Sequence, residues 1–213
     1  MAQKIAVIDY GMGNLRSVLK AVEHVAGDAV VRVTDDPAFI AAADRVVFPG
    51  QGAARDCMAA IGEHHLNQAV LRAAESKPFL GICMGLQVLL QHSEENGGTK
   101  LLGLFSGAVR RFDGLATGDN GLPLKIPHMG WSPVHQVVDH PLWRGIADET
   151  RFYFVHSYRV IPDDVSLIAG TTDYGVRFTS AIARDNLFAT QFHPEKSADA
   201  GLRLLENFVR WDV

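Results

Sequence analysis

The sequence predicts an α/β protein, with residues 1–213 forming one domain around a doubly wound mixed sheet. In the first half, short apolar runs alternate with segments whose apolar residues recur at helical spacing, as in a parallel sheet covered by helices on both sides. In the second half, strand-like runs follow one another, which predicts antiparallel additions to the parallel core. A chain of 213 residues is long enough to bury a large apolar core without disulfide or metal support.

The first half contains four apolar runs that predict buried strands: residues 5–8, 30–33, 45–48 and 78–82. A helix that carries Leu15 to Val22 on one face lies between the first two, and Gly27 can end it. Residues 53–74 predict helical structure with a break near Gly62. After the fourth strand we expect a helix from about Met84 to Glu95, ended by the glycines that follow.

The second half is dominated by runs that predict strands: residues 109–112, 131–138, 152–160, 166–172, 178–183 and 187–192. Tyr174-Gly175 and Asp185-Asn186 have the composition of hairpin turns. A final helix places Leu202, Leu205 and Phe208 on one face, and the polar, Gly-rich stretch at 113–123 predicts a single loop.

Composition excludes several classes of protein. The net charge is -4, so no basic field favours nucleic acid. Two cysteines are too few for a disulfide scaffold or for most cysteine-based zinc sites, and we expect neither a metal nor a cofactor. The chain shows no signal-peptide pattern and no apolar run of about 20 residues, which predicts a cytoplasmic protein.

The strongest candidate for chemistry is Cys83, within Gly81-Ile82-Cys83-Met84-Gly85. An apolar strand leads into this segment and a predicted helix leaves it, which is the context of a nucleophile elbow with Cys in place of Ser. The glycines allow a sharp turn, and the start of the helix favours the thiolate form. Cys57 lies inside a predicted helix, where a buried and inert thiol is the better interpretation.

A cysteine nucleophile needs a base and a group that orients the base. His193 and Glu195 lie just beyond the last predicted strand. In an extended chain, residues two apart face the same side, so Glu195 can accept a hydrogen bond from the imidazole. A His-x-Glu pattern alone is a weak signal, but together with Cys83 it predicts a Cys-His-Glu triad.

Two glycine-containing turns follow predicted strands. Gly50-Gln51-Gly52 can direct peptide N–H groups toward an oxyanion, and the N–H of Met84 would be a second donor. A plain turn explains the first of these segments equally well.

Gly11-Met12-Gly13 resembles the start of a dinucleotide fingerprint, but Arg16 occupies the place of its third glycine, so we interpret it as a tight turn with Asn14 as the helix cap. Glu94 and Glu95, at the predicted C-terminal end of the elbow helix, suit a ligand ammonium group.

Together these segments resemble the class I, triad-type glutamine amidotransferases. The opening Asp9-Tyr10-Gly11-Met12-Gly13-Asn14, the segment Pro127-His128-Met129-Gly130-Trp131, and Phe192-His193-Pro194-Glu195-Lys196 are similar, more narrowly, to the glutaminase subunits of imidazole glycerol phosphate synthases. The resemblance extends from near residue 5 to the final helix. It implies a class I glutamine amidotransferase-like fold over the whole chain.

The resemblance also implies roles for residues. Cys83, His193 and Glu195 would hydrolyse glutamine, with Gly50, Gln51, Gly52 and Met84 as the oxyanion hole. Glutamine would be bound by Gln87, Glu95, Ser157 and Tyr158. The ammonia would pass to a (β/α)₈-barrel cyclase subunit, forming a heterodimer that acts in histidine biosynthesis. Residues expected to face this partner are Asn14, Arg16, Trp131, Tyr153 and Lys196.

Two positions depart from the family pattern, and three alternatives remain. Gln51 stands where a small apolar residue is more usual, which puts the oxyanion donor geometry in doubt, and Ser132 stands where Asn is more usual after Trp131. The alternatives are the glutaminase of another synthase, a γ-glutamyl hydrolase on the same fold, and a binding module without activity. The opening segment and the His128-Met129-Gly130-Trp131 segment argue against the first alternative. Lys196 and the His128-Met129-Gly130-Trp131 segment argue against the second, and the complete triad argues against the third.

Overall fold

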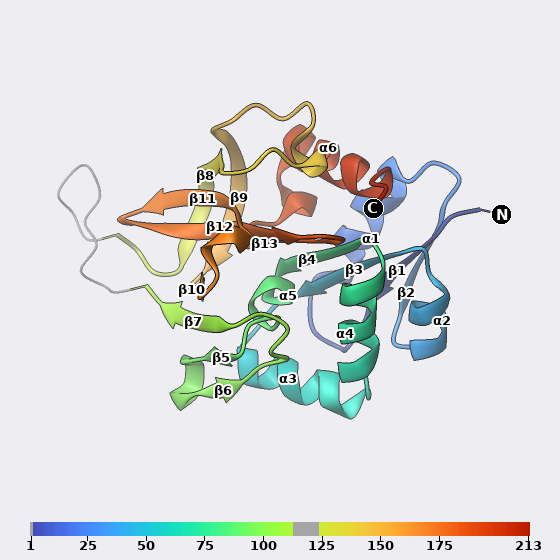
Figure 1. Ribbon diagram of the computed structural model, residues 1–213, viewed down its shortest axis with the longest axis horizontal. Helices are drawn as coiled ribbons and strands as arrows, with labels where there is room; N and C mark the ends of the chain where they lie inside the picture. The colour runs from blue at the N-terminus through green and yellow to red at the C-terminus, as the bar shows by residue number, and fades with distance from the viewer. Residues whose placement is uncertain (1, 113–123) are drawn as a thin grey trace.

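The computed structural model describes residues 2–112 and 124–213 (Figure 1). Within these residues the strands form one 13-stranded mixed sheet, whose main path runs β2-β1-β3-β4-β13-β12-β10-β7-β5-β6. The predicted α/β class with a parallel core and antiparallel additions is confirmed. The loop predicted at 113–123 lies outside the described residues.

The first four strands pair in parallel: β1 (Lys4–Ile8), β2 (Val30–Thr34), β3 (Arg45–Gly50) and β4 (Phe79–Cys83). The parallel core is completed by β13 (Leu187–Thr190), which joins the free side of β4 although more than 100 residues separate them in the chain. This pairing brings the end of β4 and the end of β13 to the same edge of the sheet, so Cys83 and the His193 segment become neighbours.

Antiparallel strands extend the sheet beyond β13: β7 (Gly107–Arg111), β8 (His128–Gln136), β9 (Thr150–His156), β10 (Tyr158–Pro162), β11 (Ile168–Tyr174) and β12 (Val176–Arg184). Two short strands, β5 (His92–Ser93) and β6 (Thr99–Lys100), form the far edge of the path. The branch β8–β9 joins the sheet through β11 and lies to one side of the main path (Figure 1).

Helices cover both faces of the parallel core (Figure 1): α1 (Leu15–Val25) and α6 (Ala198–Val209) on one face, and α2 (Pro37–Ala42), α3 (Ala54–Glu63) and α4 (Asn67–Ser76) on the other. The alternation of β1 explains this arrangement, because successive side chains of a strand point to opposite faces. Ile5 and Val7 pack in the cluster of α1 and α6, whereas Ala6 and Ile8 pack in the cluster of α2, α3 and α4.

The structure corrects the sequence prediction in three places. The helix expected at 84–95 is only α5 (Met84–Gln87), and a bend, β5 and a 3₁₀ turn follow it. Tertiary packing overrides the helical spacing here, because backbone N–H groups of residues 91, 94, 101, 102, 103 and 105 bond to carbonyls of this segment or of β7. The run at 152–160 is two strands, β9 and β10, separated at Ser157, and the last strand ends at Thr190 rather than at Phe192.

Among the described residues, none of the helices combines the length and apolar character required to cross a membrane.

Candidate functional site

Cys83 occupies the strained turn that the sequence predicts. It is the last residue of β4 and the cap of α5, with φ +56° and ψ −107°, a conformation that non-glycine residues rarely adopt. A Cβ on Gly85 would overlap the carbonyl oxygen of Phe48, and a Cβ on Gly81 would lie 2.9 Å from the carbonyl oxygen of Gly85. Gly85 therefore lets the turn press directly against β3, and Gly81 lets the turn fold back closely over β4. This close packing holds the backbone of Cys83 in the strained conformation of a nucleophile elbow.

His193 and Glu195 form a buried pair at the end of β13. His193 Nδ1 lies 2.8 Å from Glu195 Oε1, and the two side chains are 2% and 1% exposed. The predicted contact is confirmed, but the predicted reason is incomplete: only His193 is extended, while Pro194–Lys196 forms a 3₁₀ turn (η4). Ser197 Oγ donates to the carbonyl of His193, which fixes this turn.

The charges around His193 favour its protonated form. Burial lowers the pKa of His193, but the negative Cys83 sulfur and then the Glu195 carboxylate outweigh burial and raise the pKa to about 10. With Nδ1 bonded to Glu195, the other ring nitrogen, Nε2, is buried and makes no hydrogen bond with any described residue. This nitrogen is the one left to exchange a proton with a neighbouring nucleophile or leaving group.

Cys83 and His193 lie in the wall of one cavity of about 420 Å³, a volume within the usual range for small-molecule sites. Most of the residues that the sequence assigned to the site also line it: Gln51, Gly52, Met84, Gln87, Glu95, Ser157, Tyr158 and Lys196. Gly50 does not line it; instead it is buried against the elbow, in register with Cys83. The structure therefore brings the predicted triad and the predicted ligand-binding residues to one place.

The segment Gly50–Gly52 approaches the elbow closely. A Cβ on Gly50 would overlap the hydroxyl of Tyr10 and lie 2.8 Å from Met84 Cβ, so only glycine fits. Cys57 Sγ donates to the carbonyl of Gln51 at 3.3 Å, and because the peptide is planar and trans, the N–H of Gly52 points the opposite way. Cys57 itself is buried, and burial raises the pKa of its thiol to about 11, in agreement with an inert thiol.

Glu94 and Glu95 do not stand at the end of a helix, so the argument from the helix dipole is wrong for both. The carboxylate of Glu94 accepts hydrogen bonds from Arg110 and from the backbone of Arg111, and it does not line the cavity. The carboxylate of Glu95 accepts from the N–H of Ala54 at 2.7 Å and lies in the cavity wall. Only Glu95 is placed to meet a ligand ammonium group.

Of the five residues expected to face a partner, Lys196 lines the cavity and the other four do not. Trp131 of β8 and Tyr153 of β9 are a register pair with ring centroids 6.1 Å apart, and Trp131 is 48% exposed. Lys196 lies in the cavity wall on η4, against which both β9 and α1 pack. At the start of α1, Asn14 caps the helix by accepting from the N–H of Ser17, and Arg16 is exposed.

Sequence reasoning missed four residues at the site. Pro127, Val155 and His156 line the cavity, and Gln191 lies 0% exposed with its Nε2 3.7 Å from Cys83 Sγ. The signal for Gln191 was a glutamine between an apolar strand and His193, where an unpaired amide would be costly. The others could not be found from sequence, because they depend on how β8, β9 and β4 meet.

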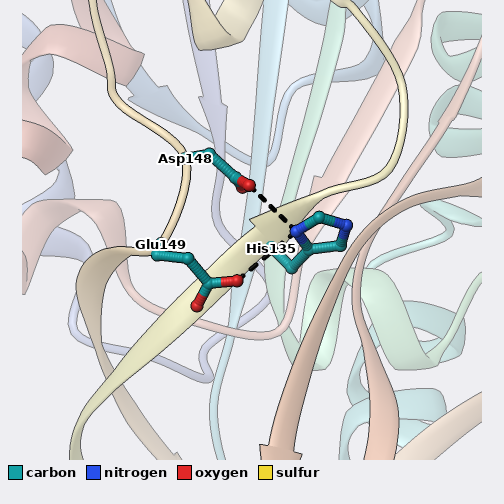
Figure 2. Close-up of side chains that lie close together, drawn as sticks. All are labelled: His135, Asp148 and Glu149. Carbon is teal, nitrogen blue, oxygen red and sulfur yellow. Dashed lines mark hydrogen bonds and ion pairs between the residues drawn. The ribbon is translucent and has the colours of Figure 1, made fainter.

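A separate group of ligand-type side chains lies outside the cavity. His135 Nδ1 is 2.9 Å from Asp148 Oδ2 and 3.4 Å from Glu149 Oε1 (Figure 2). All three residues are exposed, and Asp148 also accepts from the backbone N–H of Gln136. These contacts satisfy the side chains as an exposed hydrogen-bonded cluster, and exposed pairs of this kind contribute little to stability.

The comparisons with known proteins agree with this geometry. The family model for class-I glutamine amidotransferases matches residues 6–211. Imidazole glycerol phosphate synthase subunit HisH from Methylococcus capsulatus is 60% identical over 98% of this chain and 96% of its own length. HisH from Thiobacillus denitrificans is 61% identical over 100% of this chain and 93% of its own length.

Solved structures show the same fold at low sequence identity. The structure of PurLQS from Thermotoga maritima matches with a TM-score of 0.72 at 18% identity, covering 99% of each chain. A glutamine amidotransferase from Thermotoga maritima matches with a TM-score of 0.60 at 17% identity, covering 94% of this chain and 79% of the other. The family model and the full-length relatives lead to one conclusion: the chain belongs to the class-I glutamine amidotransferases and, within them, to the HisH subunits of imidazole glycerol phosphate synthase.

Proposed function

We propose that this chain, as one glutamine amidotransferase domain over residues 1–213, hydrolyses L-glutamine to L-glutamate and ammonia with the triad Cys83, His193 and Glu195. The observation that carries the proposal is the juxtaposition at the cavity: a cysteine on a strained elbow faces the same space as a histidine whose far nitrogen is held by a buried carboxylate. This is the geometry of nucleophilic catalysis with an oriented base.

The reaction follows from the proton positions. The Cys83 sulfur attacks the carboxamide carbon, and the resulting oxyanion is met by N–H groups of Met84 and of the Gly50–Gly52 segment. His193 Nε2 gives its proton to the departing nitrogen, which leaves as ammonia while a thioester remains on Cys83. His193 then takes a proton from water as that water attacks the thioester, the C–S bond breaks, and glutamate is released with the Cys83 sulfur as thiolate beside the protonated His193.

Glutamine is held by groups in the cavity wall. The Glu95 carboxylate pairs with the α-ammonium group, and Gln87 with the Ser157–Tyr158 segment contacts the amino-acid portion. Lys196 lies in the same wall and is also one of the residues that we expect to face the partner. This placement leaves the carboxamide directed toward Cys83.

The ammonia passes to a (β/α)₈-barrel cyclase subunit, and the heterodimer makes imidazole glycerol phosphate and aminoimidazole carboxamide ribonucleotide in histidine biosynthesis. The relatives named HisH, a subunit of imidazole glycerol phosphate synthase, support this proposal. The exposed Trp131 beside Tyr153 fits a buried aromatic anchor of such an interface. A reducing compartment, the cytoplasm, suits the free thiols of Cys57 and Cys83.

The test is glutamine hydrolysis by the Cys83→Ala variant in complex with the cyclase. We expect no glutamate formation, while synthase activity with added ammonium salt continues. Cys57→Ser is the matched control, because it removes the other buried thiol while keeping a donor for the Gln51 carbonyl. Normal glutamine turnover by Cys83→Ala would overturn the assignment. We also expect little hydrolysis by the chain without its partner, because the Gly50–Gly52 donors lie beside the partner face.

A further inference from the structure

The Cys83 sulfur lacks the long helix that the sequence predicted behind it. The helix α5 has four residues, so it contributes one turn of aligned peptide dipoles rather than three. A buried thiolate needs hydrogen-bond donors nearby. Among the described side chains, Gln191 supplies one: its Nε2 lies 3.7 Å from Cys83 Sγ.

The orientation of the Gln191 amide is fixed by a chain of hydrogen bonds. The carbonyl of Tyr158 can only accept, so the group of Gln87 that lies 3.3 Å from it must be the NH₂ group. The same NH₂ group of Gln87 lies 3.0 Å from Gln191, so Gln191 must present its carbonyl oxygen there. The other end of the Gln191 amide, which faces Cys83, is therefore an N–H donor.

The Tyr158 carbonyl also accepts a hydrogen bond from the buried His156, which in turn contacts the buried His128. His156 Nδ1 donates to it at 2.8 Å, and His128 Nδ1 lies 3.0 Å from His156 Nε2. Burial lowers the pKa of His156 to about 3 and of His128 to about 4, so both rings are neutral near pH 7. A neutral His156 with a proton on Nδ1 accepts at Nε2, and Ser132 then donates to His128 Nε2 at 2.8 Å. Both lone pairs of the Tyr158 carbonyl are thus used.

We propose that Gln191 is a further functional residue of the nucleophile site: its amide presents an N–H donor to the Cys83 sulfur, and Gln87 with the Tyr158 carbonyl keeps that donor in place. The proposal deepens the glutaminase function and rests on it. Gln191 is held in position, because its backbone N–H donates to the carbonyl of Ser180 at 2.8 Å and its side chain is 0% exposed. A rotated Gln191 amide would place its oxygen next to the Cys83 sulfur and its NH₂ group next to the NH₂ group of Gln87. Both contacts would be repulsive.

The test measures the thiolate without using glutamine. Alkylation of Cys83 by iodoacetamide in the full-length chain is followed by peptide mass spectrometry from pH 5 to pH 10. The reaction with Cys57 is an internal measure of unfolding, because that thiol is buried. The ionisable groups that face Cys83 or line the same cavity are unchanged in the variants: Tyr10, Cys57, Glu95, His156, Tyr158, His193, Glu195 and Lys196.

In Gln191→Met, which keeps the length of the side chain and removes the donor, we expect alkylation of Cys83 at pH 7 to slow about tenfold and its pH profile to move about one unit upward. Gln191→Glu, which replaces the donor with an acceptor, should move the profile at least as far. Gln136→Met is the matched control, because it makes the same substitution at a glutamine whose Nε2 donates to two backbone carbonyls outside the cavity. A profile in folded Gln191→Met that stays within twofold of the original would overturn the proposal.

A measurement on the unmutated chain covers the case in which Gln191→Met does not fold. With ¹⁵N in the glutamine side chains, one NH₂ resonance should shift with pH at the midpoint of the alkylation profile, and this shift should vanish in Cys83→Ala. If no side-chain amide responds to Cys83, the role of Gln191 is refuted. Hydrolysis of glutamine by Cys83→Ala would instead refute the glutaminase function, so the two failures can be told apart.

Discussion

Replacing Glu195 by Gln removes one buried charge from the triad without changing the volume of the side chain. In the native chain Glu195 Oε1 accepts from His193 Nδ1 at 2.8 Å, while Glu195 Oε2 is buried and bonds to no described residue. A glutamine at 195 has two orientations. Either its oxygen replaces Oε1 and leaves an unpaired buried NH₂ group, or its NH₂ group faces Nδ1 and forces the proton of His193 onto Nε2.

Each orientation has an estimable cost. The rise in the pKa of His193 from 6.5 to about 10 corresponds to about 5 kcal/mol in favour of the imidazolium, net of burial, with Cys83 contributing more than Glu195. Exchanging a charge-assisted hydrogen bond for a neutral one loses about 1–1.5 kcal/mol, or about tenfold. The reversed orientation gives the wrong tautomer, which costs about 10⁴-fold in a serine protease triad. We therefore expect kcat to fall between about 10-fold and 10⁴-fold.

The assay is steady-state glutamate release by the complex with its cyclase, with kcat and KM determined separately. KM should change little, because Glu195 does not line the cavity. The pKa of His193, followed by ¹⁵N resonances of the ring, should drop from about 10 toward 6.5. Glu206→Gln is a control, because the half-buried Glu206 pairs with the exposed Arg203 and Arg210 and lies outside the cavity. A loss of kcat smaller than threefold would contradict the assigned role of Glu195.

Two further predictions concern the partner face and stability. Trp131→Ala should leave the melting temperature unchanged within about 2 °C, because the ring is half exposed. The same variant should weaken binding to the cyclase by about 2 kcal/mol or more, as measured by calorimetry. An unchanged affinity would exclude Trp131 as an anchor. His128 and His156 have a pKa of about 4 and about 3 in the folded chain, below 6.5 in the unfolded chain, so the unfolded state binds more protons. The free energy of unfolding should therefore fall by about 1.4 kcal/mol per pH unit for each histidine as the pH drops from 6.5 toward 4. In urea titrations, His128→Asn should remove the contribution of one histidine to this pH dependence. An unchanged dependence of the free energy of unfolding on pH would contradict the prediction.

The parallel core could be predicted from sequence because each of its strands is a short apolar run bounded by turn residues or helical spacing. Residues 84–95 could not, because their apolar spacing fits a helix in isolation. In the fold, Val88, Leu89 and Leu90 are fully buried without being helical, and their backbone groups bond to residues 102–105. In this segment the spacing of apolar residues predicts which residues are buried, but it does not predict their backbone conformation.

The triad could be predicted because each member sits in a local motif, a strand-turn-helix segment for Cys83 and a His-x-Glu segment for the other two. The argument for Glu94 and Glu95 assumed a helix that does not extend to these residues. Glu95 nevertheless lines the cavity, because the chain bends after α5 and places Glu95 at the start of a 3₁₀ turn. Gln191 and His156 carry no local motif. Their positions depend on β13 pairing with β4 and on β9 turning into β10, which are contacts between distant segments.

The hydrogen bonds around Tyr158 also restrict how glutamine can bind. Both lone pairs of the Tyr158 carbonyl are used, by Gln87 and by His156, so this carbonyl cannot accept from the ammonium group of the substrate. The NH₂ group of Gln87 donates to Tyr158 and Gln191, which leaves its Oε1 for a ligand. Gln87 must therefore act on glutamine as an acceptor. In the proposed binding mode, the Ser157–Tyr158 segment must then contribute other groups, and Glu95 is the anionic group of the cavity wall that we propose for the substrate ammonium.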